Sequence, residues 1–236
     1  IRDREVPMLL YKHRKVIYFA FILFFFFMVI GALSAHYQPS YARATLGDEY
    51  INMTLDNIEK GDPMAVYKSG GNWSSFIAIT VNNIRVAFDA YLYALSAGIL
   101  TFFIAIKNGI MVGVFQYFCY QAGALQASLR AIWLHGAMEI FSMVIATAAG
   151  FVLALSVLIP KTFSRILSFK IGFRESFYIF LATLPFFIAA GFIEGFITRY
   201  YYDMPLVLNI IIILGTLSVI SYYFLIYPII KHYKSK

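Results

Sequence analysis

Six long apolar runs limit how this chain can fold more than any other feature of its sequence. They occupy residues 16–33, 76–106, 109–128, 131–159, 177–197 and 206–227. Each is close to or above the roughly 20 apolar residues with which an α-helix crosses a bilayer. A helix also satisfies its own backbone hydrogen bonds inside hydrocarbon. The runs predict an all-α fold, a polytopic transmembrane helical bundle of about six spans.

The composition agrees with a membrane solvent. Hydrophobic residues make up 61% of the 236 positions and charged residues 13%, whereas soluble domains have about 45–50% and about 25%. The formal charge of +7 comes from Lys and Arg beside the apolar runs, where they meet anionic lipid headgroups. We therefore expect membrane lipids as partners and no nucleic acid. The single cysteine, Cys119, excludes an intramolecular disulfide.

The positive charges also predict the orientation, because cytoplasmic loops carry more Lys and Arg. Thirteen fall on one side, five on the other, and Arg85 is left over. The thirteen are Arg2, Arg4, Lys12, Arg14, Lys15, Lys107, Lys161, Arg165, Lys170, Arg174, Lys231, Lys234 and Lys236, and the five are Arg43, Lys60, Lys68, Arg130 and Arg199. Both termini are therefore expected in the cytoplasm.

This topology divides the chain into five parts. Residues 1–15 form a cytoplasmic juxtamembrane segment, which we expect to be the end of a longer N-terminal region, and 16–33 form the first span. An extracytoplasmic loop with short helices, 34–75, leads to a core of five spans, 76–230, and a cytoplasmic tail, 231–236. We call residues 34–75 the outer segment.

Seven polar side chains lie inside or at the edge of three runs, where an ionisable group costs roughly 2.5–3.5 kcal/mol on insertion scales. This intramembrane polar cluster consists of Asn82, Asn83, Arg85, Asp89, His135, Glu139 and Glu194. In the predicted topology all seven fall in the outer half of the bilayer. Their chemistry is expected to face the extracytoplasmic side.

The spacing of the charged members predicts how they meet. Arg85 and Asp89 are four residues apart, as are His135 and Glu139, so each pair shares a helix face. We expect the three runs to converge, with Arg85 within salt-bridge reach of Glu139 or Glu194. Separate charges in hydrocarbon would carry a large desolvation cost.

Two interpretations of the cluster remain open. Its hydrogen bonds can simply hold the bundle together, or the excess of carboxylates, with His135 as a second cation, can relay protons or bind a cation or a polar headgroup. His135 and Glu139 resemble half of a zinc site, but the H-E-x-x-H motif is absent. We assign no catalytic residue, no metal and no cofactor.

Small residues four apart predict close helix packing. They are Gly109 with Gly113, Ala146 with Gly150, and Gly191 with Gly195. Pro185 is expected to interrupt the run 177–197, because proline removes a backbone hydrogen bond.

Several stretches resemble the stage II sporulation protein M family. They are "NNIRVAF", "KNGIMVG", "HGAMEI" followed by "ATAAGF", and "AAGFIEGFITR", in the family's order. The outer segment's "GDPMAVYKSG" is similar to the form in relatives from bacteria that do not sporulate. The family pattern falls on Asn82, Asn83, Arg85, Asn108, Gly109, His135, Gly136, Glu139, Glu194 and Gly195, and Asp89 is outside it.

The resemblance implies a multi-pass protein of the bacterial inner membrane. The sporulation member acts in engulfment with peptidoglycan-degrading partners, and the relatives belong to envelope-associated complexes. We expect a non-enzymatic component that engages a partner or a lipid-linked ligand through an outer-facing polar pocket. Other membrane or envelope proteins, or further copies of the chain, are the expected partners. The alternatives are a proton- or cation-coupled transporter or lipid-handling protein, and an intramembrane metal-dependent hydrolase.

Overall fold

The computed structural model describes residues 6–68, 70–160 and 162–235, and its regular elements in these ranges are all helices. The prediction of an all-α fold is confirmed. Four of the cations used to predict the orientation, Arg2, Arg4, Lys161 and Lys236, lie outside the described residues.

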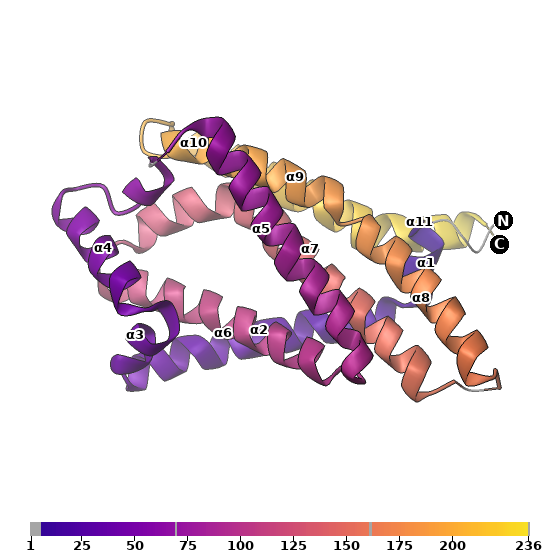
Figure 1. The fold of residues 1–236 in the computed structure, drawn as a ribbon. Helices are drawn as coiled ribbons and strands as arrows, with labels where there is room; N and C mark the ends of the chain where they lie inside the picture. Colours follow the sequence, from indigo (N-terminus) through magenta and orange to yellow (C-terminus); the bar gives the residue numbers. More distant parts are fainter. Residues whose placement is uncertain (1–5, 69, 161, 236) are drawn as a thin grey trace.

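The elements follow one another as a series of long helices with short helical turns between them (Figure 1). The N-terminal half contains α1 (Val6–Lys12), α2 (Arg14–Tyr37), α3 (Ser40–Leu46), α4 (Asp48–Glu59), η2 (Ala65–Lys68), α5 (Asn72–Leu92), η3 (Tyr93–Ser96) and α6 (Ile99–Gln121). The C-terminal half contains α7 (Leu125–Leu158), α8 (Arg165–Leu181), α9 (Leu184–Phe192), the π-helical turn η4 (Ile193–Ile197), η5 (Thr198–Tyr200), α10 (Leu206–Ser221), η6 (Tyr222–Ile226) and α11 (Tyr227–Lys234).

Among the described residues, five helical stretches are long and apolar enough to cross a membrane. They are Arg14–Tyr37, Ile99–Gln121, Leu125–Leu158, Arg165–Tyr200 and Leu206–Lys234. The helix α5 does not qualify, because its sequence contains Asn82, Asn83, Arg85 and Asp89. Large apolar side chains are exposed along these helices, among them Ile22 and Ile211, as expected for surfaces that face lipid.

The prediction of one span over 76–106 and the next over 109–128 is wrong. The chain turns at residues 93–98, where Ala97 and Gly98 adopt left-handed backbone conformations with φ of 58° and 80°. A side chain on Gly98 would lie 2.9 Å from Ala154 Cβ, so glycine serves both the turn and the contact with α7. Ser96 is the only small polar residue in this turn. The prediction instead placed the boundary between the two spans at Lys107, which lies inside α6.

Helix α7 is the centre of the bundle. It contacts α2, α5, α6, α8, α9 and α10, and every residue from Phe141 to Ala154 is buried. Many of these residues are Ala, Gly, Ser or Thr, and small side chains let neighbouring backbones approach. A helix buried on all sides needs no polar face, which explains why residues 141–154 carry no charged side chain.

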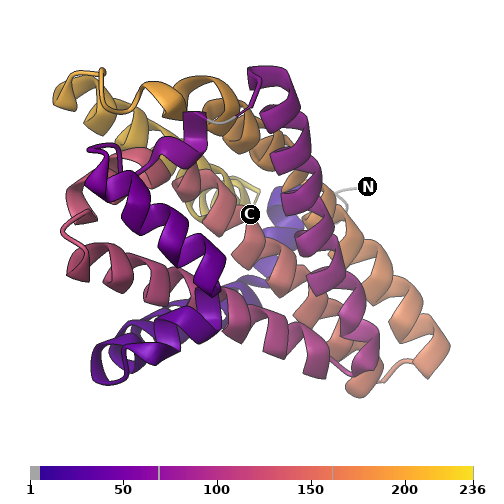
Figure 2. The ribbon, with the colours of Figure 1, turned by 60° about the vertical axis from the view of Figure 1, so that its left-hand side comes forward.

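The two ends of the bundle differ (Figure 1). Helices α1 and α11 and the adjoining ends of α7 and α8 lie at one end, and α3 and α4 lie at the other. In Figure 2, where this second end comes forward, α4 crosses the front of the bundle. A separate hydrophobic cluster fixes the outer segment here; its buried members are Ala35, Ala42, Ile51, Met64, Val114, Phe118, Cys119, Ala131, Leu134 and Tyr201.

Glycines let α2 and α6 pack backbone to backbone. A Cβ atom on Gly113 would lie 1.9 Å from the carbonyl oxygen of Met28, and one on Gly109 would lie 2.7 Å from that of Phe24. From the other helix, a Cβ on Gly31 would lie 2.4 Å from Ile110 O. The α2–α6 contact therefore has no room for side chains at these three points.

Candidate functional site

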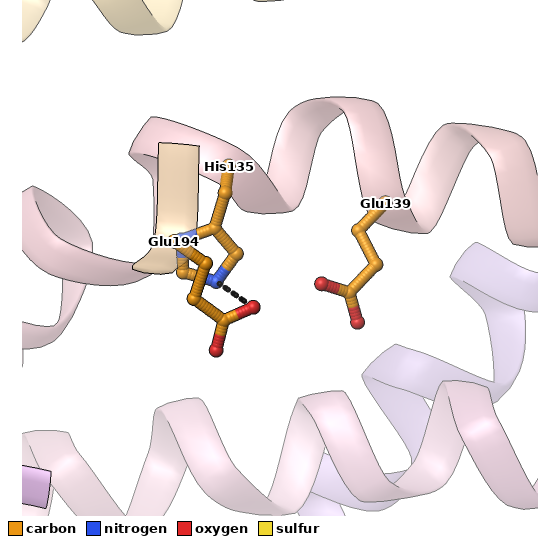
Figure 3. Close-up of side chains that lie close together, drawn as sticks. All are labelled: His135, Glu139 and Glu194. Carbon is orange, nitrogen blue, oxygen red and sulfur yellow. Dashed lines mark ion pairs between the residues drawn. The ribbon is translucent and has the colours of Figure 1, made fainter. Parts of the chain in front are cut away.

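Three ionisable side chains from two elements point into one space (Figure 3). His135 and Glu139 lie four residues apart on the same face of α7, and Glu194 comes from η4. His135 Nε2 lies 3.6 Å from Glu194 Oε2. One nitrogen or oxygen atom from each of the three lies within 4.8 Å of the others. We call these three residues the His–Glu–Glu cluster.

The local backbone explains why Glu194 faces α7. The predicted interruption at Pro185 is present, since α8 ends at Leu181 and α9 begins at Leu184. After α9, the chain widens into the π-helical turn Ile193–Ile197, which contains Glu194. Turns of this kind occur often at functional sites because they re-aim a side chain. Gly195 lets this turn approach α5, where its Cβ would meet Phe76 N at 3.0 Å.

Further side chains hold the cluster in place. His135 is 4% exposed, and its Nδ1 lies 3.1 Å from the hydroxyl oxygen of Thr198. That hydroxyl in turn donates to the backbone oxygen of Ile193 at 3.3 Å. The Asn83 side chain lies beside the Glu139 carboxylate, and the Tyr67 ring packs edge-on against the His135 ring with centroids 5.7 Å apart.

The cluster lines a cavity of about 350 Å³ that lies between α6, α7 and the outer segment. Its other walls are largely apolar or aromatic: Thr45, Leu46, Tyr50, Tyr67, Met111, Val112, Phe115, Gln116, Ile132, Trp133, Gly136 and Ile140. Burial raises the pKa of Tyr50 to about 12. Burial, reinforced by the Glu194 carboxylate, raises the pKa of Tyr67 well above its usual value. Both phenols therefore stay neutral at physiological pH.

The structure brings together only part of the predicted polar cluster. Asn83 joins the three side chains, but Asn82 and Arg85 are exposed and Asp89 is half-buried. No ion pair among the described residues involves Arg85 or Asp89. The expected salt bridge of Arg85 with Glu139 or Glu194 is therefore not formed. Asn83 and Arg85 are two residues apart, so they point to different faces of α5.

The glycines singled out for packing all lie at close contacts, four of them with backbone atoms and Gly191 with a side chain. Besides Gly109, Gly113 and Gly195, a Cβ on Gly150 would meet Ala90 O at 2.8 Å, and one on Gly191 would meet Thr80 Oγ1 at 2.1 Å. The contacts of Gly150 and Gly191 set the distance of α5 from α7 and α9. They thereby place Asn83 beside the His–Glu–Glu cluster.

Sequence reasoning missed Thr198, Tyr50 and Tyr67. Thr198 comes four residues after Glu194, a spacing that places two helical residues on one face. This spacing could have predicted that Thr198 lies beside Glu194. Tyr50 and Tyr67 lie in the outer segment, in α4 and η2. No periodicity connects these two residues with α7, so their place above the cavity depends on tertiary packing.

The fold and the site define an all-helical membrane protein in which one buried histidine and two half-buried glutamates lie together below the outer segment. The chain belongs to the stage II sporulation protein M family, whose model matches residues 20–199. The comparison with curated proteins found no match, and the comparison with solved structures found none.

Proposed function

We propose that the protein is a non-enzymatic component of an envelope-associated complex in the bacterial inner membrane, and that it binds a lipid-linked ligand in the cavity above the His–Glu–Glu cluster. One observation carries the proposal. The cavity combines a small polar floor with a wall of apolar and aromatic side chains, as expected for a site that binds an amphipathic molecule.

The surroundings of the cavity support a ligand with an apolar chain. An apolar groove of about 570 Å³ runs between α2, α6 and α7 on the same half of the bundle. Gln116 and Trp133 line both the groove and the cavity, so the two adjoin. A polar headgroup in the cavity and its chain in the groove would fit this pair of spaces.

The expected topology gives the direction of access. With both termini in the cytoplasm, α3 and α4 would lie toward the extracytoplasmic side, and so would the cavity that Leu46 and Tyr50 of these helices line. A component of an envelope complex would meet lipid-linked envelope precursors on this side. The outer segment would then supply the surface for a partner protein.

Native mass spectrometry of protein purified in mild detergent tests the ligand. The wild type is expected to retain a co-purified lipid, and Met111→Trp is expected to lose most of it. Met111 lines the cavity and is 41% exposed, so a larger side chain can enter the cavity without disturbing the core. Ile99→Trp is the matched control, because Ile99 lines a different cavity and is 59% exposed. Equal lipid retention in both variants would contradict the proposal.

Affinity purification from native membranes tests the complex. Recovery with another envelope protein or as a homo-oligomer is expected; recovery of a lone monomer counts against a role as a complex component.

A second candidate is a proton- or cation-coupled transporter or lipid-handling protein. Two carboxylates and a histidine share one cavity in the His–Glu–Glu cluster, and such groups within membrane helices mark proton and ion paths. In proteoliposomes, this function predicts proton- or cation-dependent movement of a lipid or solute that Glu139→Gln abolishes. An absence of such movement in the wild type would exclude it.

A further inference from the structure

The geometry points to a binding site for a divalent transition-metal ion such as Zn²⁺, formed by His135 Nε2 and one carboxylate oxygen each of Glu139 and Glu194. The inference depends on these three side chains and is independent of the lipid-linked ligand proposed above. It also differs from the sequence-based expectation, in which no metal was assigned.

The types of ligand atom and the distances between them are the first argument for a metal site. Imidazole and carboxylate are ligands that zinc and related divalent ions accept. Ligand atoms around a tetrahedral zinc lie about 3.4 Å apart, given metal–ligand distances near 2.1 Å. His135 Nε2 and Glu194 Oε2 are already 3.6 Å apart, and the complete set lies within 4.8 Å. All three side chains extend into the same space (Figure 3), and binding would require rotations of Glu139 and Glu194 that close the remaining gap.

The hydrogen bonds of His135 carry the second step. The site requires the tautomer in which the Thr198 hydroxyl donates to Ile193 O and accepts from Nδ1–H of His135, and both distances allow it. In the neutral ring Nε2 then carries a lone pair. This lone pair faces the Glu194 carboxylate, and Nε2 forms no hydrogen bond among the described residues. Two electron-rich groups in contact need a positive charge between them, which a proton or a metal ion can supply. The Thr198 contact has the form of the outer hydrogen bond that orients metal-binding histidines.

The charge balance carries the third step. Within the described residues, no Lys or Arg forms an ion pair with Glu139 or Glu194. Two half-buried carboxylates that are ionised without a cation have a desolvation cost, and a divalent ion would neutralise both at once. Three protein ligands also leave a coordination position open toward the cavity, as in zinc sites that accept a further ligand.

Metal analysis of the purified protein tests the site. Protein stripped with a chelator and dialysed against Zn²⁺ is expected to bind about one ion per chain, the stoichiometry of a single three-ligand site. Glu139→Gln and Glu194→Gln keep the side-chain shape and are expected to lose at least about 100-fold in affinity, because each removes an anionic ligand. Glu175→Gln is the matched control. Glu175 also pairs with a histidine, His13 at 2.8 Å, but at the opposite end of the bundle and beside Lys12, and this variant is expected to bind like the wild type.

Two further variants separate ligation from structure. Thr198→Val is expected to weaken Zn²⁺ binding about 10–100-fold, the usual effect of losing an outer hydrogen bond. Glu194→Cys is expected to bind Cd²⁺ with a new sulfur-to-cadmium absorption band, because a thiolate prefers soft ions. Failure of the stripped wild type to bind Zn²⁺ or Mn²⁺, or unchanged binding by both glutamine variants, would overturn the inference. A Glu194→Cys variant that is folded but shows no cadmium band would also overturn it.

Discussion

Replacing Gly113 by alanine is expected to lower the free energy of unfolding by about 1–3 kcal/mol, the usual cost of forcing atoms into a filled contact. The new Cβ would lie 1.9 Å from Met28 O, 2.8 Å from Met28 C and 3.0 Å from Ala32 N. These are backbone atoms, so no rotamer change can relieve the clash and α2 has to move away from α6. Thermal unfolding in detergent measures the effect. Cys119, the only cysteine and fully buried, reports it by reacting with a maleimide dye as the protein unfolds.

Gly215→Ala provides the control for this prediction. Gly215 lies in α10, and a Cβ atom there would have nothing within 4 Å. The same chemical change should therefore leave the stability equal or raise it by up to about 1 kcal/mol, because alanine is the better helix former. If both alanine variants unfolded at the same temperature, the backbone contact between α2 and α6 would not be a source of stability.

Arg130→Met is expected to destabilise the protein by about 3 kcal/mol, since a hydrogen bond to a charged group contributes about 1.5–3 kcal/mol. The Arg130 guanidinium donates to Tyr201 O at 2.9 Å and to Met204 O at 2.7 Å. It thus joins the start of α7 to the chain between η5 and α10. The Tyr201 hydroxyl donates to Asp62 at 3.1 Å, so the outer segment is held through the same residue.

The comparison for Arg130 is Arg43→Met. Arg43 forms an ion pair with Asp48 at 2.8 Å, but both side chains are well exposed, and such pairs contribute at most about 1 kcal/mol. Unfolding followed by circular dichroism and by Cys119 labelling should therefore separate the two variants. If Arg43→Met lost as much stability as Arg130→Met, the two hydrogen bonds from Arg130 to backbone carbonyls would not be the cause of the destabilisation.

The depth of polar residues predicted much of the site. The positions of His135, Glu139 and Glu194 within two apolar runs predict that they lie in one half of the membrane, and the structure brings them together with Asn83. Depth alone does not determine which side of a helix faces inward. Arg85 shows this, because it lies at the depth of Asn83 but on an exposed face.

The turn between α5 and α6 could not be found from hydropathy. Residues 91–106 are apolar apart from Ser96 and Thr101, so the break at Ala97 and Gly98 depends on local backbone conformation. The positions of Tyr50 and Tyr67 above the cavity depend on contacts between distant parts of the chain. Neither kind of information is carried by the spacing of residues within one run.

The enclosure of α7 has a consequence for how the protein is made. The helices around it include α2, α5 and α6, which the ribosome produces earlier, and α8, α9 and α10, which it produces later. When α7 leaves the translocon, Glu194 and Thr198, which contact His135 in the finished fold, have not yet been inserted. His135 and Glu139 therefore enter the membrane before their contacts with η4 and η5 can form. The last third of the chain therefore has to be inserted before the site is complete.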